Sequence, residues 1–311
     1  MQRQLNMFVT TAEAMNISRA SQVLHISQPA LSRALQELEA QLGVTLLLRT
    51  TRQLSLTHDG QQFLPVAQRL LRDLEQATAD LREHAKGLTG SVTLAVGGAF
   101  GCTVLPAVIE AFALSHPGVR LRLVDDNSLG ICSRIKHAQA DVGVGSAAGD
   151  MTGITCKLLL AAPLGLLGNP MRFNLQAAAH FDTLGPDALA RLPLLKEPAD
   201  SSITLALNSH GSALVNHMSR GIEVSSLALQ LALAQAAVGV AVVSALGASH
   251  HAAQGLQFVP LEPEIKREVF LMTRGDRALN PSARALEAAI TAGLAHAALH
   301  PCVRLAHYHE G

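Results

Sequence analysis

Four polar side chains near the start of the chain have the types and spacing that suit recognition of DNA bases. Gln28, Ser32, Arg33 and Gln36 share one face of a helical pattern. A glutamine can form two hydrogen bonds to adenine and an arginine two to guanine, each pair giving about 1–3 kcal/mol of discrimination. A serine hydroxyl suits a phosphate or base contact. Isolated clusters of this kind are more often solvated surface, so the interpretation depends on the elements around them.

Those elements have the pattern of a helix-turn-helix. Ser27 can cap a helix by accepting a hydrogen bond from its first amides, and Pro29 is tolerated in the first turn. The opposite, apolar face ends at Gly43 and consists of Ala30, Leu31, Ala34, Leu35, Leu38 and Leu42. A short helix capped by Ser18 precedes the link of residues 25–27. A first helix has an apolar face of Leu5, Phe8, Val9 and Ala12. Two helices joined by so short a link predict a helix-turn-helix.

A basic hairpin and a long helix follow. Residues 44–48 and 54–56 predict two strands with a tip of Arg49, Thr50, Thr51 and Arg52. Thr57 can cap a helix that continues to about Lys86, with a kink at Pro65. Its apolar positions recur at steps of three and four and are Phe63, Ala67, Leu70, Leu74, Ala77, Leu81 and Leu88. This heptad spacing predicts pairing with a second copy of the helix; packing within one chain is the alternative.

Residues 18–60 resemble the DNA-binding domain of the LysR-type transcriptional regulators, a family of bacterial proteins. The specific part is HISQPALSRALQELEAQLG, followed by Leu-x-x-Arg-Thr and Leu-Thr-x-x-Gly. The resemblance continues to about residue 295 through architecture and short stretches such as Leu105-Pro106 and Val238-Gly239-Val240. One departure is Leu47, which stands where the family usually has phenylalanine. This change still leaves an apolar side chain in the hairpin.

The resemblance implies roles for particular residues. It places the third helix in the major groove of DNA and the hairpin against the backbone and the minor groove. The implied DNA-binding residues are Ser27, Gln28, Pro29, Ser32, Arg33, Gln36, Arg49, Thr50 and Arg52. The implied dimerisation residues on the long helix are Phe63, Ala67, Leu70, Leu74, Ala77 and Leu81. Expected partners are double-stranded promoter DNA, a small-molecule effector, further copies of the chain in a homodimer or homotetramer (a dimer of dimers), and RNA polymerase.

Composition limits how such binding can work. The 311 residues include 24 Lys and Arg against 24 Asp and Glu, and residues 1–86 carry nine basic and eight acidic side chains, a net charge of +1. DNA affinity must therefore come from a few arginines placed on one face and from dimerisation. With 49% apolar residues, the chain can bury a sizeable core. Four dispersed cysteines favour reduced thiols, and no signal peptide or continuous apolar span is found. We expect a soluble cytoplasmic protein without a membrane partner.

The composition changes near residue 90, where glycine becomes frequent and short β-type runs alternate with helical ones. We expect a winged helix-turn-helix over 1–60, a linker and dimerisation helix with a hinge over 61–89, an effector-binding domain over 90–300 and a tail over 301–311. Subdomain I should comprise about 90–161 and 268–300, and subdomain II about 162–267. The expected fold class is α/β with an all-α N-terminal winged helix-turn-helix, a long linker helix and two Rossmann-like α/β subdomains, similar to type 2 periplasmic binding proteins.

Two such subdomains with two chain crossings predict a ligand cleft between them. The turn over residues 97–103 ends a strand and opens a helix whose free amides favour an anion, so we expect a small organic anion as effector. Family members often have hydroxyl residues in this turn, where Gly97 and Ala99 stand here. The expected effector-binding residues are Gly97, Gly98, Ala99, Phe100, Cys102, Thr103, Ser201 and Ser202. Helix capping is the alternative role of Thr103, Ser201 and Ser202.

The same turn supports an alternative function. Residues 97–101 resemble the dinucleotide-binding fingerprint without its first glycine, and Asp125-Asp126 follow the second strand where a ribose-binding acid would lie. An NAD-dependent oxidoreductase is therefore the alternative. Otherwise we expect no enzyme, no cofactor and no metal. The sequence has no nucleophile-elbow motif, and neither His250-His251 nor the histidines after residue 295 have the spacing of a zinc site.

Overall fold

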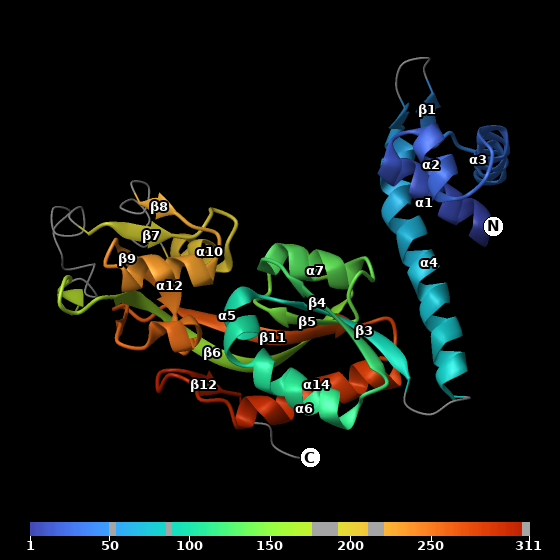
Figure 1. Cartoon of the computed structure of the whole chain (residues 1–311). Helices are drawn as coiled ribbons and strands as arrows, with labels where there is room; N and C mark the ends of the chain where they lie inside the picture. The colour runs from blue at the N-terminus through green and yellow to red at the C-terminus, as the bar shows by residue number, and fades with distance from the viewer. Residues whose placement is uncertain (50–53, 85–88, 176–191, 211–220, 307–311) are drawn as a thin grey trace. The chain divides into compact units, whose positions relative to one another are not determined.

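The computed structural model describes residues 1–49, 54–84, 89–175, 192–210 and 221–306. The chain divides near residue 87 into two compact units (Figure 1). In chain order, the first unit contains α1 (Gln2–Ala14), α2 (Ile17–Val23), α3 (Gln28–Leu42), β1 (Leu47–Arg49), β2 (Leu54–Leu56) and α4 (His58–His84). These are the predicted helix-turn-helix, hairpin and long helix.

One apolar core joins the three short helices of this unit to the start of α4. Leu31 and Leu35 of α3 are fully buried in it, together with Phe8 of α1. The rings of Phe8 and Phe63 lie 5.7 Å apart between centroids, which joins α1 to α4. One cap was predicted wrongly: α2 begins after Asn16, whose Oδ1 accepts a hydrogen bond from the Arg19 amide at 3.0 Å, whereas Ser18 lies inside the helix.

The hairpin β1–β2 is tied to α3 by a carboxylate. The two strands pair antiparallel. One oxygen of Glu39 accepts hydrogen bonds from the amides of Leu46 and Leu47, at 2.7 and 3.0 Å. A charged acceptor makes these bonds stronger than neutral ones. Glu39 therefore fixes the start of the hairpin against α3.

Further hydrogen bonds join the hairpin to α4. The Thr57 hydroxyl donates to the Thr45 carbonyl at 2.7 Å and accepts from the Gly60 amide at 2.9 Å, so Thr57 caps α4 as predicted. Gly60 is buried against the Leu46 carbonyl, and a Cβ atom at Gly60 would lie 2.1 Å from that oxygen. Only glycine fits there without a shift of the backbone.

The second unit has a mixed α/β architecture. Its elements in chain order are β3 (Gly90–Val96), α5 (Gly98–Thr103), α6 (Leu105–Ser115), β4 (Val119–Asp125), α7 (Ser128–Lys136), β5 (Val142–Gly145), β6 (Ile154–Gly168), β7 (Leu194–Lys196), α10 (Ser202–Ser209), β8 (Ile222–Glu223), α12 (Leu227–Gln235), β9 (Val240–Ser244), α13 (Ala245–Ala248), η1 (His251–Ala253), β10 (Gln257–Pro260), β11 (Lys266–Arg274), α14 (Pro281–Ala295) and β12 (Arg304–Leu305). The strands pair in the order β4-β3-β5-β11-β6-β9-β7-β8.

Subdomain I is built on the parallel strands β4, β3 and β5, as the alternation of strands and helices predicted. Helix α7 covers one face of this sheet, and α6 and α14 cover the other (Figure 1). The carboxyl ends of β3 and β4 are level, because Val96 pairs with Asp125. The loops that follow these strands therefore emerge side by side at one edge of the sheet.

Subdomain II has buried side chains on both faces of its sheet. Strands β9, β7 and β8 are parallel, and β6 pairs antiparallel with β9. Along β9, Val240 and Val242 enter one apolar core, whereas Ala241 and Val243 enter another. This alternation follows from the two-residue period of a strand. The helices and hairpin of the first unit, together with the two α/β subdomains of the second, confirm the predicted fold class.

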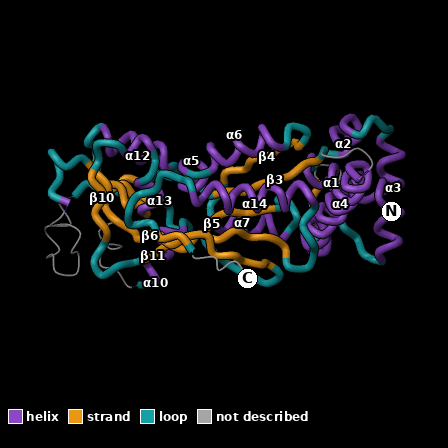
Figure 2. Tube along the Cα trace, turned by 90° about the horizontal axis from the view of Figure 1, so that it is seen from below, coloured by secondary structure: helices purple, strands orange, loops and turns teal. Residues whose placement is uncertain are grey.

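Strands β6 and β11 run through both subdomains and pair antiparallel (Figure 1, Figure 2). The division predicted near residues 161 and 268 differs from the structure in two places. Ala245 and Leu246 of α13, assigned to subdomain II, are buried in the core of subdomain I. The predicted tail is also part of the fold as far as it is described, because Arg304 and Leu305 pair with β6. The local sequence does not show which core such a segment joins, because that depends on contacts with residues far away in the chain.

The structure also tests the expectations about membrane-spanning segments and cysteines. Within the described ranges, no helix has the length and apolar character needed to cross a bilayer. The thiols of Cys102, Cys132, Cys156 and Cys302 are all free.

The close approach at Gly60 gives a stability prediction. Gly60→Ala should lower the free energy of unfolding by about 1–3 kcal/mol, the usual effect of an added methyl group in a packed site. At a helix position without close contacts, the same change would stabilise the protein by up to about 1 kcal/mol. The sign of the change in unfolding free energy therefore distinguishes the two cases. Denaturant unfolding followed by circular dichroism measures it, with the exposed neighbour Gln61→Ala as control. A stabilised Gly60→Ala variant would contradict the packing described above.

Candidate functional site

The exposed face of α3 carries the residues predicted to contact DNA. Gln28, Pro29, Arg33 and Gln36 are exposed, and Ser32 is half-buried. Ser27 is the cap of the helix, and its hydroxyl accepts from the Ala30 amide at 3.4 Å. The amphipathic pattern explains this placement, because Leu31, Leu35 and Leu38 of the opposite face are buried in the core of the unit, although Ala30 and Leu42 of the predicted apolar face are exposed. Gln28, Arg33 and Gln36 thus present polar side chains to solvent from one helix.

The hairpin residues are described only in part. Arg49 is the last residue of β1, and its side chain lies outside the described part of the structure. Thr50 and Arg52 lie outside the described residues altogether. Leu48, beside them on β1, is 52% exposed.

The predicted seam along α4 divides into two parts. Phe63 and Ala67 pack into the core of the first unit, and Ala67 has no exposed surface. The prediction of Ala67 as a dimer contact was therefore wrong, because this residue is fully covered within its own unit. Phe63 is partly exposed, and its role in a dimer stays a prediction. Further along, Leu70 is 47% and Leu74 41% exposed, and Ala77 is exposed too. The side chain of Leu81 lies outside the described part.

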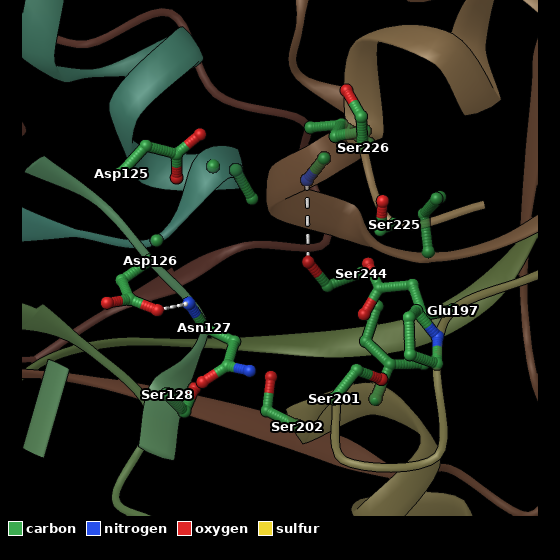
Figure 3. Close-up of a pocket in the computed structure, with 18 of the residues that line it drawn as sticks. Asp125, Asp126, Asn127, Ser128, Glu197, Ser201, Ser202, Ser225, Ser226 and Ser244 are labelled. Atoms are coloured by element: carbon green, nitrogen blue, oxygen red, sulfur yellow. Dashed lines mark hydrogen bonds between the residues drawn. The ribbon is translucent and has the colours of Figure 1, made fainter. Parts of the chain in front are cut away.

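A second candidate site is a cleft in the second unit with a cavity volume of about 480 Å³ (Figure 3). One wall is formed by the loops after β3 and β4 in subdomain I. The other wall is formed by the loop before α10, the start of α12 and the end of β9. The polar lining residues are Cys102, Asp125, Asp126, Asn127, Ser128, Glu197, Asp200, Ser201, Ser202, Ser225, Ser226, Ser244 and Arg267. The position agrees with the rule that ligands bind beyond the carboxyl ends of parallel strands.

The structure brings together six of the eight residues predicted for this site, which are Gly97, Gly98, Ala99, Cys102, Ser201 and Ser202. Phe100 is only 2% exposed and belongs to the core of subdomain I. The Thr103 hydroxyl donates to the Ala99 carbonyl at 2.6 Å, and Thr103 does not line the cleft. Ser201 also has its alternative role, because it caps α10 by accepting from the Thr204 amide at 3.1 Å.

Arg267 reaches the cleft from β11 and was missed by the sequence analysis. Its Nε donates to the Ser146 hydroxyl at 3.0 Å, which itself donates to the Glu268 carbonyl at 2.7 Å. These hydrogen bonds hold the guanidinium so that its Nη2 lies next to Gly97. A Cβ atom added at Gly97 would lie 3.8 Å from this nitrogen. Burial lowers the pKa of Arg267, and the charge of Glu197 opposes that shift.

The acidic side chains of the cleft were also not assigned to an effector. Asp126 forms an ion pair with Arg134 at 2.6 Å, and the side-chain Nδ2 of Asn127 donates to the Asp200 carboxylate at 3.0 Å from one wall to the other. Burial raises the pKa of Glu197, while Arg267 and a hydrogen bond from Ser201 lower it. The sequence did contain a signal for these residues: Asp125 and Asp126 directly follow the predicted strand 119–124, where ligand-binding residues of α/β proteins are often found.

The glycines of the turn do not have the close contacts of a dinucleotide fingerprint. A Cβ at Gly101 would lie 3.5 Å from Val96 Cγ1, an ordinary van der Waals distance. At Gly98 the nearest atom would be Asp125 Oδ1, at 3.8 Å. In the fingerprint, one glycine allows tight packing of helix on strand. The glycines here instead leave space on the side of the cleft.

The chain was compared with known proteins. Residues 2–61 match the family model "Bacterial regulatory helix-turn-helix protein, lysR family", and residues 85–295 match "LysR substrate binding domain". An uncharacterised HTH-type transcriptional regulator, YfeR of Shigella flexneri, is 28% identical over 290 residues, 91% of each chain.

Solved structures give the same fold. The crystal structure of CbnR, a LysR family transcriptional regulator, has a TM-score of 0.65 at 23% identity, covering 94% of this chain and 99% of that one. Full-length CbnR complexed with its target DNA has a TM-score of 0.63, with the same identity and coverage. Together with the matched helix-turn-helix and substrate-binding domains, these findings show that the chain belongs to the LysR family of transcriptional regulators.

Proposed function

We propose that the chain binds a promoter through α3 and the β1–β2 hairpin, and that a small molecule in the cleft changes this binding. The observation that carries the proposal is the exposed polar face of α3, with Gln28, Arg33 and Gln36 held on a helix whose other face is buried. Gln28 and Arg33 are then the base-reading residues, and Ser32 and the hairpin contact the DNA backbone. Regulation, and not oxidoreduction with NAD, is the function that the turn at Gly97 supports.

Dimerisation should use the part of α4 that its own core leaves exposed. Leu70, Leu74 and Ala77 follow the heptad spacing of a coiled coil, and exposed leucines at such positions favour burial against a second helix. A two-fold pair of subunits would place two copies of α3 on a DNA site with two half-sites. Two such dimers would form the expected homotetramer.

The effector should bind in the cleft and bridge its walls. The anionic group expected from the sequence would face Arg267, whose Nη2 lies next to Gly97. Ser202 and Ser226 offer hydroxyls from the other wall. A ligand that contacts both walls favours one arrangement of the subdomains, and only such a difference in affinity can shift an equilibrium. The altered arrangement would change how the paired subunits bind the promoter and RNA polymerase.

Loss of Arg33 should weaken sequence-specific binding. Arg33→Ala should reduce affinity for an operator selected from random-sequence DNA by about 1–3 kcal/mol, with a smaller change on random DNA. Fluorescence anisotropy measures both. Arg120→Ala removes the same charge from exposed β4 and should have no such effect. Equal affinity of Arg33→Ala and wild type for the operator would contradict the assignment of α3.

Charges on the exposed seam should break the dimer. Leu70→Asp combined with Leu74→Asp places like charges against each other in an apolar interface, which we expect to dissociate the subunits. Sedimentation velocity should show smaller species. Gln76→Asp, on the opposite face by helical spacing, is the control. An unchanged mass of the double variant would exclude this seam from the interface.

Changes in the cleft should reduce the effector response without loss of DNA binding. Ser202→Ala should lower the response, and Gly98→Val should lower it more, because the new side chain fills the space beside the backbone. Thr103→Val, whose hydroxyl is bonded within its own helix, is the control. An effector found by thermal-shift screening gives about 2.7 kcal/mol of stabilisation at a hundred times its Kd, which Ser202→Ala and Gly98→Val should reduce and Thr103→Val should keep. Equal stabilisation of all three variants would place the effector elsewhere.

A further inference from the structure

The charged side chains that line the cleft are mostly acidic. Asp125, Asp126, Glu197 and Asp200 are carboxylates, and Arg267 is the basic residue among the described lining. The whole chain has as many basic as acidic residues, so this excess is local to the cleft. A concave site of one charge sign concentrates ligands of the opposite sign. The cleft therefore differs from the purely anion-binding site that its glycine-rich turn predicted.

Three of the four carboxylates already have partners. Asp126 is paired with Arg134, Asp200 accepts from Asn127, and Glu197 faces the charge of Arg267. The carboxylate of Asp125 has no hydrogen bond or ion pair with any residue that the structure describes. Partial burial and the neighbouring charge of Asp126 raise the pKa of Asp125. Asp125 is exposed to solvent and lines the cleft, so its carboxylate is accessible to a ligand.

The carboxylates also belong to opposite walls. Asp125 and Asp126 follow β4 in subdomain I, whereas Glu197 and Asp200 lie in the loop before α10 in subdomain II. Figure 3 shows Asp125 and Asp126 on one side of the cavity and Glu197 on the other. Like charges on facing walls repel, and the repulsion grows as the walls approach. A cation between them removes this repulsion, whereas a ligand with only negative charges adds to it.

We propose that the effector is zwitterionic and that its cationic nitrogen, an ammonium or guanidinium group, binds the Asp125 carboxylate. The assignment rests on the proposed effector role of the cleft and names the class of molecule that it takes. The anionic group of the same molecule faces Arg267 beside Gly97, and its carbon chain contacts Leu227 and Val243, which also line the cavity. Amino acids and their derivatives have this pair of charges.

A matched series of five-carbon probes tests the charge preference directly. 5-Aminopentanoate is a zwitterion, 1,5-diaminopentane a dication and glutarate a dianion, and all three have similar length. Isothermal titration calorimetry on the full chain should show that 5-aminopentanoate binds roughly ten- to a hundredfold more tightly than glutarate, the range expected for one charge-assisted hydrogen bond. 1,5-Diaminopentane should also bind more tightly than glutarate.

Variants then assign the preference to Asp125. Asp125→Asn should reduce the affinity for 5-aminopentanoate by roughly the same factor and leave glutarate unchanged or tighter. Asp125→Glu keeps the charge and should retain most of the preference. Asp150→Asn, which removes a charge from subdomain I outside the cleft, is the control. Circular dichroism of each variant confirms that it is folded.

The outcomes separate this assignment from the proposed function. If glutarate binds as tightly as 5-aminopentanoate and Gly98→Val abolishes its binding, the cleft is the effector site and the cationic assignment is wrong. If Asp125→Asn keeps the wild-type preference, Asp125 does not bind the nitrogen and the assignment is overturned. Absence of heat with all three probes also overturns it, while the operator measurement on Arg33→Ala tests the regulatory function independently.

Discussion

The antiparallel pairing of β6 with β11 is the constraint on which the cleft depends. Both strands run through subdomains I and II, so the two walls are held by one shared ladder of backbone hydrogen bonds. The ladder has a register shift between Val269 and Phe270, and Arg267 lies two residues before it. The guanidinium is therefore anchored where the chain crosses between the subdomains, and not on a surface loop. A connection of two paired strands favours motion of the walls as whole bodies, the kind of hinge or shear movement that ligands bias.

In the first unit, the residues that make the family motif recognisable divide into two physical roles. Glu39, Thr57 and Gly60 fix the hairpin to α3 and α4 through hydrogen bonds and one close backbone approach. Gln28 and Arg33, by contrast, project from the unit and contribute little to its packing. The first set explains why the motif predicts the fold so specifically. A change in the second set would not disturb the core, and under the proposed function it would alter the DNA that is recognised.

Local features of this structure could be predicted from the sequence, and features that depend on distant contacts could not. The caps at Ser27 and Thr57 and the parallel strands of subdomain I follow from neighbouring residues and periodicity. Phe100 was misplaced because a short turn does not reveal which of its side chains faces the core. The contacts in the cleft are even harder to predict, because they join residues far apart in the sequence. Asn127 hydrogen-bonds to Asp200, 73 residues away, and Arg267 hydrogen-bonds to Ser146, 121 residues away. The assignment of Ala67 to the dimer failed because the heptad pattern is the same whether α1 or a second chain covers it.

The equal numbers of acidic and basic residues conceal an uneven distribution of charge. A total near zero argues against binding driven by overall attraction to DNA, but it does not describe any one surface. In the cleft, partial burial and the charge of Asp126 raise the pKa of Asp125, and exposure to water limits the destabilisation that its ionised form causes in the ligand-free fold. Because the folded-state pKa is the higher one, this destabilisation is present above that pKa and disappears as the carboxyl group is protonated. In the ligand-free protein water solvates this exposed carboxylate, and the cationic nitrogen of the proposed effector would replace that water when it binds.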